Sequence, residues 1–312
     1  MNEQAPIAVA APARQPRRPL GVIARVLRNT SAAIGGAVAL VMIMVGLLAP
    51  LIAPIDPAQI NPVARNKAPG FESTVRNDDG TRSRISHHFG TDSLGRDIFS
   101  RTVHGTRNSL LVGVTVAVVA VFLGLLIGLA AGYVRVLDGI VMRFMDGLMA
   151  IPSNLLAMAL VSLSRGGSLT AVIVALVVPE IPRVVRLVRA IVLSVREEPY
   201  VEAAVMVGTP TPRLIYRHVL PNTIAPLIVQ GTFVCASAIL LEAILSFLGI
   251  GLKPEFPTWG NIMAEGRSAF MLFPHTILYP GIFLALTVLA VNMLGDGLRD
   301  ALDPKMAGRE KA

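Results

Sequence analysis

The sequence predicts an all-α membrane protein with six transmembrane helices, and two observations carry this fold class. Hydrophobic residues make up 53% of the 312-residue chain and charged residues only 15%, whereas about a quarter of a typical soluble domain is charged. Three uncharged stretches also exceed the roughly 20 residues that a helix needs to cross about 30 Å of hydrocarbon. They separate Arg28 from Asp56, Arg107 from Arg135, and Arg267 from Asp296.

The apolar blocks give the order of the spans. We expect them at residues 32–54, 109–132, 140–162, 168–189, 224–248 and 276–295. Pro179 and Pro182 lie inside the fourth span, which predicts a kink or an early end there. Gly124, Gly128 and Gly132 in the second span recur every four residues, a spacing that favours close helix packing.

The placement of Lys and Arg predicts the topology. Six crossings put both termini on one side, and seventeen Lys and Arg lie on that side or at its edge. The two shorter loops on the opposite side hold three. The positive-inside rule therefore places both termini and residues 199–222 in the cytoplasm. Residues 56–107 would be exported despite eight Lys and Arg against six Asp and Glu, because long loops cross largely regardless of charge.

Several classes of function are excluded or disfavoured. Cys235 is the only cysteine, so no intrachain disulfide can form, and the pair His87-His88 lacks further ligands, so we expect no metal site. The net charge of +8 does not form a basic stripe interleaved with aromatic residues, which argues against nucleic acid. The chain has no GxxxxGK[ST] sequence, so it cannot hydrolyse ATP through a P-loop. We expect neither an enzyme nor a bound cofactor.

The polar segment between the fourth and fifth spans has the properties of a stiff coupling element. Pro199 suits the first turn of a helix, and Ala203 and Ala204 are small helix formers that let another protein approach the backbone. Gly208 can adopt the positive φ that ends one helix and starts another. Residues 213–219 predict a second short helix, so we expect a helix–turn–helix.

This segment resembles the EAA loop of ATP-binding-cassette (ABC) importer permeases, usually written EAA, three residues, Gly, nine residues, Ile, one residue, Leu-Pro. The matching positions are Glu202, Ala203, Ala204, Gly208, Leu220 and Pro221. The sequence departs from the pattern at His218, where the pattern has Ile. The resemblance implies that the loop, residues 199–222, docks onto a separate cytoplasmic ATPase, which uses the ATP. The alternative is an ordinary cytoplasmic loop in which Glu202 is a solvated carboxylate.

Further stretches look like the dipeptide, oligopeptide and nickel group of these permeases: residues 90–110, 245–249, 259–260 and 292–304. The resemblance implies the type I ABC importer permease fold and a bacterial inner-membrane subunit. The implied partners are a second, similar permease in a heterodimer, two ABC ATPases and an extracytoplasmic substrate-binding protein. Peptides are the leading cargo, with nickel, glutathione or another small peptide-like solute as alternatives.

On this basis the chain divides into four parts: a cytoplasmic tail (1–30), the first helix with an extracytoplasmic segment (31–106), the type-1 permease core of five helices (107–298) and a second cytoplasmic tail (299–312). A secondary transporter or channel is the main rival. It would show internal repeats with broken helices at corresponding places, and the break at Pro179 and Pro182 has no evident counterpart in the other half.

Three charged residues within the spans are candidates for lining the translocation path. Arg143 and Asp146 are three residues apart in the third span, so they share a helix face and can pair. Glu242 lies about two turns from the end of the fifth span. An ionised group in the middle of a membrane costs roughly 2.5–3.5 kcal/mol on insertion scales, so such residues face protein or water. The alternative is structural: an interfacial ion pair and a helix–helix hydrogen-bond site.

Overall fold

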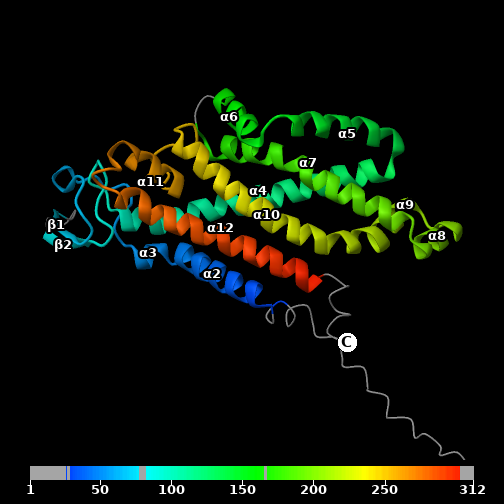
Figure 1. The fold of residues 1–312 in the computed structure, drawn as a ribbon, viewed down its shortest axis with the longest axis horizontal. Coiled ribbons are helices and arrows are strands. Elements are labelled where there is room, and N and C mark those ends of the chain that lie inside the picture. Colours follow the sequence, from blue (N-terminus) through cyan, green and yellow to red (C-terminus); the bar gives the residue numbers. More distant parts are fainter. Residues whose placement is uncertain (1–25, 27–28, 77–81, 165–166, 303–312) are drawn as a thin grey trace, which may run out of the picture.

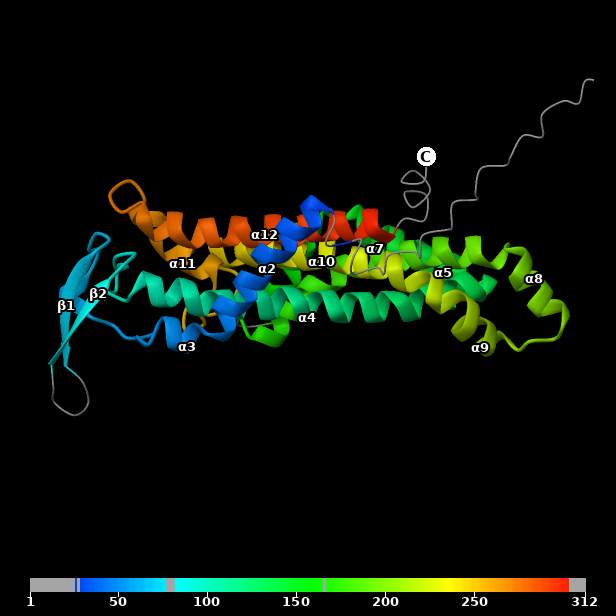
Figure 2. The ribbon, with the colours of Figure 1, turned by 90° about the horizontal axis from the view of Figure 1, so that it is seen from below.

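The structure is a computed structural model that describes residue 26 and residues 29–76, 82–164 and 167–302. It is an elongated helical bundle with a β-hairpin at one end and the loop between α7 and α10 at the other (Figures 1 and 2). The α-helices of the described part are α2 (Thr30–Leu47), α3 (Ala49–Ile52), α4 (Ile98–Tyr133), α5 (Arg135–Ala150), α6 (Ser153–Leu163), α7 (Leu169–Arg196), α8 (Pro199–Met206), α9 (Thr211–Leu214), α10 (Leu220–Phe247), α11 (Trp259–Gly266) and α12 (His275–Leu302). The predicted tails lie mostly outside the described residues.

The all-α membrane fold is confirmed, and the count of six spans is approximate. In the described residues, α2, α4, α12 and the continuous helix Thr211–Phe247 are long and apolar enough to cross a membrane, and the bent pair α5–α6 makes a fifth span if it is counted as one. α7 occupies the place of the predicted fourth span. It falls outside that set because Glu180, Arg183 and Arg186 interrupt its apolar run.

The third and fourth spans differ in shape from the prediction. α5 and α6 meet at 91° at Ile151, whose backbone is extended. Pro152 follows, and proline disfavours helical backbone at the preceding residue and cannot donate a hydrogen bond. The sequence predicts a kink or an early end of the fourth span at its prolines, and of the two the early end is wrong. α7 continues through Pro179 and Pro182, both buried, for 28 residues.

α4 and α7 pack closely because valine side chains of α7 lie directly against glycines of α4, where no side chain keeps the helices apart. A Cβ atom added to Gly128 would lie 2.7 Å from the Cβ of Val188, nearer than real side chains approach. The same contact repeats one turn away on either side, at Gly124 against Val184 and at Gly132 against Val192. The close packing predicted for these glycines is confirmed.

A chain of hydrogen bonds ties the hairpin of β1 (Phe71–Arg76) and β2 (Arg82–His87) to α4. The Ser73 Oγ lies 2.8 Å from the His87 Nε2, and the His87 Nδ1 lies 2.9 Å from an Asp97 carboxylate oxygen. The other oxygen of Asp97 accepts a bond of 2.6 Å from the backbone N–H of Ser100 and so caps α4. The hairpin is therefore anchored to the first turn of α4.

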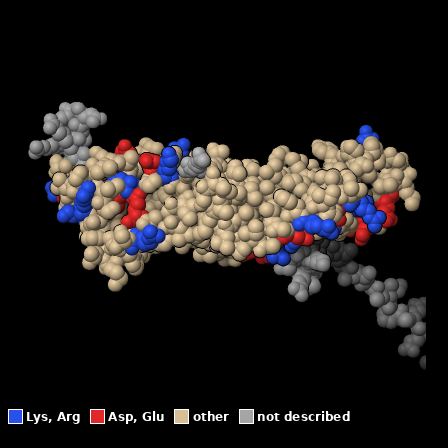
Figure 3. All heavy atoms as spheres, turned by 90° about the horizontal axis from the view of Figure 1, so that it is seen from above, with Lys and Arg blue, Asp and Glu red and all other residues tan. Residues whose placement is uncertain are grey.

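Buried ion pairs join the same end of α4 to α11. The Arg96 Nε donates to Asp92 over 2.7 Å, and the Arg101 Nη2 donates to Glu265 over 3.1 Å. Arg96 also bonds to Glu265. Burial raises the pKa of the Glu265 carboxyl, while the nearby Arg101 and Arg96 oppose that rise. These charges lie together at the hairpin end, away from the largely uncharged belt in the middle of the face shown in Figure 3.

We predict that Gly128→Leu destabilises the protein by ~1–3 kcal/mol or more, because the added side chain overpacks the contact with Val188. Gly147→Leu is the matched control, since a Cβ at Gly147 meets nothing within 4 Å. Thermal unfolding of the two purified variants in detergent would compare them. Equal unfolding temperatures would contradict the close α4–α7 contact.

Candidate coupling site

The segment that matches the EAA pattern forms the end of the molecule opposite the hairpin (Figures 1 and 2). α8 holds Glu202, Ala203 and Ala204, with Pro199 in its first turn. Glu202 and Ala203 are exposed and Ala204 is half-buried. The predicted first helix of the loop is therefore present, and it presents small side chains to the outside.

Gly208 ends α8 in the way that the sequence predicts. Its φ is +83°, a left-handed value that side chains with a Cβ disfavour. Its N–H donates to the Val205 carbonyl over 2.9 Å, and the next N–H, of Thr209, donates to the Ala204 carbonyl over 3.1 Å. A Cβ at Gly208 would meet nothing within 4 Å. Glycine is favoured here because of the backbone conformation, and not because a side chain would clash with a neighbour.

The second limb of the loop is longer than a separate short helix. α9 continues through a π-helical turn, Ile215–Val219, directly into α10, so the expectation of a helix ending before Leu220-Pro221 is wrong. Pro221 cannot donate to a carbonyl four residues back, and its ring crowds that carbonyl. The wider π turn just before it accommodates the proline without ending the helix.

Both limbs are attached to the bundle and to each other. One residue each of α8, α9 and the π-helical turn faces inward. These residues are Val201, Leu214 and Val219, and each is at most 5% exposed. The rings of Tyr200 and His218 are 5.7 Å apart, so the residue that replaces the usual Ile contacts the first turn of α8. The loop is a structured knuckle in which α8 is supported by the start of α10.

The apex of the knuckle is apolar, which our sequence reasoning missed. Val205, Met206 and Val207 are 55%, 89% and 86% exposed; we call these three residues the coupling tip. Large exposed apolar side chains on a polar loop mark a surface that another protein covers. The signal was available as three consecutive apolar residues directly before Gly208.

The path candidates on α5 do not pair with each other. Asp146 accepts a bond of 2.5 Å from the Arg186 Nη2 of α7, and the expected Arg143–Asp146 pair is absent. The reason is that α7 carries arginines that face α5 and compete for its carboxylates, as Arg189 does by bonding to Asp138. Arg143 is exposed and has no ion-pair partner among the described residues.

Glu242 lies at a helix–helix contact. It is fully buried in α10 and accepts a bond of 2.7 Å from the Ser246 Oγ. α11 packs tightly beside it, since a Cβ on Gly260 would lie 2.7 Å from the Ala243 Cα. Glu242 therefore lies where a helix–helix hydrogen-bond site is expected. That Glu242 lines the translocation path stays a prediction.

One ion pair in the middle of α7 is not predicted from the sequence. Glu180, 1% exposed in the middle of α7, accepts a bond of 3.0 Å from the Ser237 Oγ of α10. The Arg183 Nη1 lies 3.2 Å from each of its carboxylate oxygens. The charge lies between Pro179 and Pro182 inside an apolar run, a signal that could have drawn attention to it.

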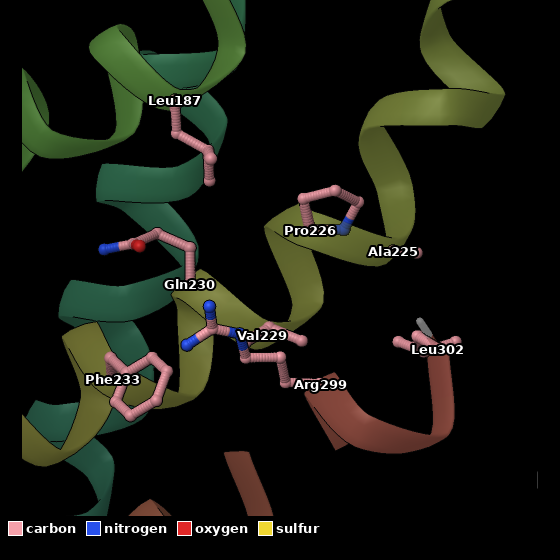
Figure 4. A pocket seen from close by; sticks show the side chains of 8 residues that line it. All are labelled: Leu187, Ala225, Pro226, Val229, Gln230, Phe233, Arg299 and Leu302. Carbon is pink, nitrogen blue, oxygen red and sulfur yellow. The ribbon is translucent and has the colours of Figure 1, made fainter. Parts of the chain in front are cut away.

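A separate cavity of about 450 Å³ opens between α7, α10 and the end of α12 (Figure 4). It is mostly apolar, with Leu187, Pro226, Val229 and Phe233 in its lining. Arg299 extends its guanidinium toward Gln230. This cavity lies nearer the knuckle than Glu180 does, because Leu187 in its lining is about two turns further along α7 toward α8.

Two family models match the chain. The model described as "Binding-protein-dependent transport system inner membrane component" matches residues 120–308, and the model of the N-terminal transmembrane domain of oligopeptide transport permease C matches residues 21–69. Together they cover the first helix with the segment up to residue 69, and the helical bundle from the middle of α4 onward.

Curated relatives match along nearly the whole chain. A probable peptide ABC transporter permease of Sinorhizobium fredii is 49% identical, covering 90% of this chain and 91% of the relative. A dipeptide transport system permease of Alkalihalophilus pseudofirmus is 41% identical over 89% and 87%. A glutathione transport system permease of Pectobacterium atrosepticum is 38% identical over 90% and 89%.

We predict that Gly208→Val weakens the end of α8, because a side chain at a φ of +83° costs roughly 1–2 kcal/mol. Amide hydrogens of α8 should then exchange about tenfold faster, as a cost of about 1.4 kcal/mol implies. Gly208→Asn is the control, since Asn tolerates the left-handed region. Unchanged exchange in the Val variant would be incompatible with the observed helix end.

Proposed function

Since the chain belongs to the family of inner-membrane components of binding-protein-dependent transport systems, we propose that it forms half of the membrane path of an ATP-driven importer for di- and oligopeptides. The names of its relatives support this cargo, because the dipeptide and peptide permeases are 41–49% identical to it. A glutathione permease at 38% identity supports a modified tripeptide as the alternative cargo. The single observation that carries the proposal is this family membership. Relatives named as peptide permeases support it, because they match about nine-tenths of the chain.

The knuckle fits the docking element of a separate ATPase. It is a short helix with a defined end, it is anchored by Val201, Leu214 and Val219, and it exposes an apolar tip. An element of this kind can pass a rigid-body movement from one protein to another. The chain itself has no P-loop sequence, so we expect the partner to bind and hydrolyse the ATP, with no cofactor held here.

The proposed topology places the knuckle in the cytoplasm and the hairpin end outside a bacterial inner membrane. It is supported by the excess of Lys and Arg near the knuckle, which the positive-inside rule assigns to the cytoplasm. Both termini would then be cytoplasmic. The hairpin end, with its ordered polar segment, becomes the surface for an extracytoplasmic substrate-binding protein.

The remaining partner is a second, similar permease. α4 keeps a row of large apolar residues exposed on one face, at three- and four-residue spacing. The row comprises Leu111, Val114, Val118, Phe122 and Leu126, all at least 50% exposed. Such a row faces lipid or another membrane subunit. One bundle cannot enclose a path alone, so we propose a heterodimer above two ATPases.

Deleting the gene for this chain should abolish ATP-dependent uptake of a labelled dipeptide in cells that carry its natural partners, and restoring the gene should return it. Uptake of nickel and of glutathione, measured in parallel, tests the alternative cargoes. Undiminished dipeptide uptake together with lost nickel or glutathione uptake would replace the peptide assignment while keeping the importer.

Two charges at the coupling tip should uncouple the subunit from its ATPase. In Met206→Glu/Val207→Glu the docking partner would have to bury carboxylates against an apolar surface, which costs several kcal/mol unless they are paired. We expect the ATPase to be lost when the variant is purified through a tag on this chain. Val63→Glu is the matched control, since Val63 is 86% exposed at the opposite end. Full recovery of the ATPase with the double variant would argue against docking at the tip.

A further inference from the structure

The pair of Glu180 and Arg183 lies inside the predicted fourth span, residues 168–189. Both residues are near the middle of the 28-residue helix α7. Glu180 is 1% exposed and bonded to Ser237, so its charge is contained within the protein. The Arg183 side chain, however, is 47% exposed. A half-exposed guanidinium within a membrane span faces water or a polar partner rather than lipid.

A cavity meets this requirement. It has a volume of about 320 Å³ and lies between α7 and the bend that joins α5 to α6. Its lining includes Ile151, Pro152, Ser153, Asn154, Pro179 and Arg183. The bend is a second, independent indication of water. Non-helical backbone within a membrane span is either buried in protein or lines an aqueous cavity, and Ile151 is 46% exposed. The extended backbone at Ile151 is such a site.

The guanidinium of Arg183 keeps binding capacity toward this cavity. Its Nη1 bonds to Glu180, while its Nε and Nη2 make no hydrogen bond to the described residues. The next arginine of α7 differs, because the Arg186 Nη2 bonds to an exposed carboxylate, Asp146. Arg183 therefore combines a fixed position with free donors. Ser153 and Asn154 add hydrogen-bonding groups on the other wall.

We propose that this cavity is a binding site on the translocation path for the carboxylate of the peptide substrate, with Arg183 as the group that binds it. Arg presents paired N–H donors that match the two oxygens of a carboxylate. Glu180, held by Ser237, positions the guanidinium and prevents it from folding back. This proposal rests on the peptide-import function proposed above.

Uptake into vesicles that contain the complete importer, with saturating binding protein, tests the proposal. A dipeptide with a free carboxylate is compared with the same dipeptide as its C-terminal amide. We expect Arg183→Gln to slow uptake of the acid by about tenfold or more, the usual effect of losing a charge-assisted hydrogen bond, and to leave the amide nearly unchanged. Any preference of the binding protein for the acid or the amide cancels, because the uptake of each peptide by a variant is divided by the uptake of the same peptide by the wild type.

Two further variants make the outcome decisive. Arg186→Gln, on the same helix and 44% exposed, should leave the ratio of acid to amide uptake at the wild-type value. Glu180→Gln/Arg183→Gln removes both charges, so no unpaired carboxylate is left to disturb folding, and it should repeat the selective loss. Equal losses for acid and amide, or no loss for either, would overturn the proposal. Failure of the wild type to transport any peptide would instead refute the proposed function.

Discussion

Hydrocarbon gives a backbone amide no hydrogen-bond partner and a charged group no solvation, and the arrangement of this chain follows from that constraint. Charged side chains gather at the two ends on the face shown in Figure 3. Two features in the middle depart from the rule: the extended backbone at Ile151 and the pair of Glu180 and Arg183. Ile151 and Arg183 both line one cavity. Since each needs a polar environment, a single aqueous space between α5–α6 and α7 accounts for both.

The same helix, α7, links that cavity to the knuckle. The valines of α7 pack against the glycines of α4 along one face. At the end of α7, Arg196 donates to the Gly132 carbonyl over 2.8 Å and lies over the Tyr133 ring, so this end is also attached to α4. α8 begins three residues after α7 ends. From Arg183 to the end of α7 at Arg196 is about 20 Å at 1.5 Å per residue. A force on the coupling tip therefore reaches the cavity through α8, the two-residue link at Glu197 and Glu198, and then one continuous helix, α7.

Local chemistry explains which features could be predicted from the sequence. Gly208 and the glycines of α4 act through their own backbone or their missing side chains, so the left-handed turn and the close packing follow from residue type and spacing. The bend at Ile151 followed from Pro152 in principle, but the surrounding apolar run concealed it. Asp146 could not be assigned to Arg186, because helix periodicity describes neighbours on one helix and not the charges that an adjacent helix presents.

The ion pairs between α5 and α7 explain how movement could change the cavity. Asp138–Arg189 and Asp146–Arg186 join α7 to α5, on one side of the bend, and no ion pair joins α7 to α6 in the described residues. α5 is thus held to α7 by paired charges, whereas α6 carries no charged residue and packs on α7 without ion pairs. A displacement of α7 and α5 together would be absorbed at Ile151, where no helical hydrogen bond has to break. The wall of the cavity that carries Ser153 and Asn154 would then move relative to Arg183, so the bend is placed where coupling to the ATPase can open or close the site.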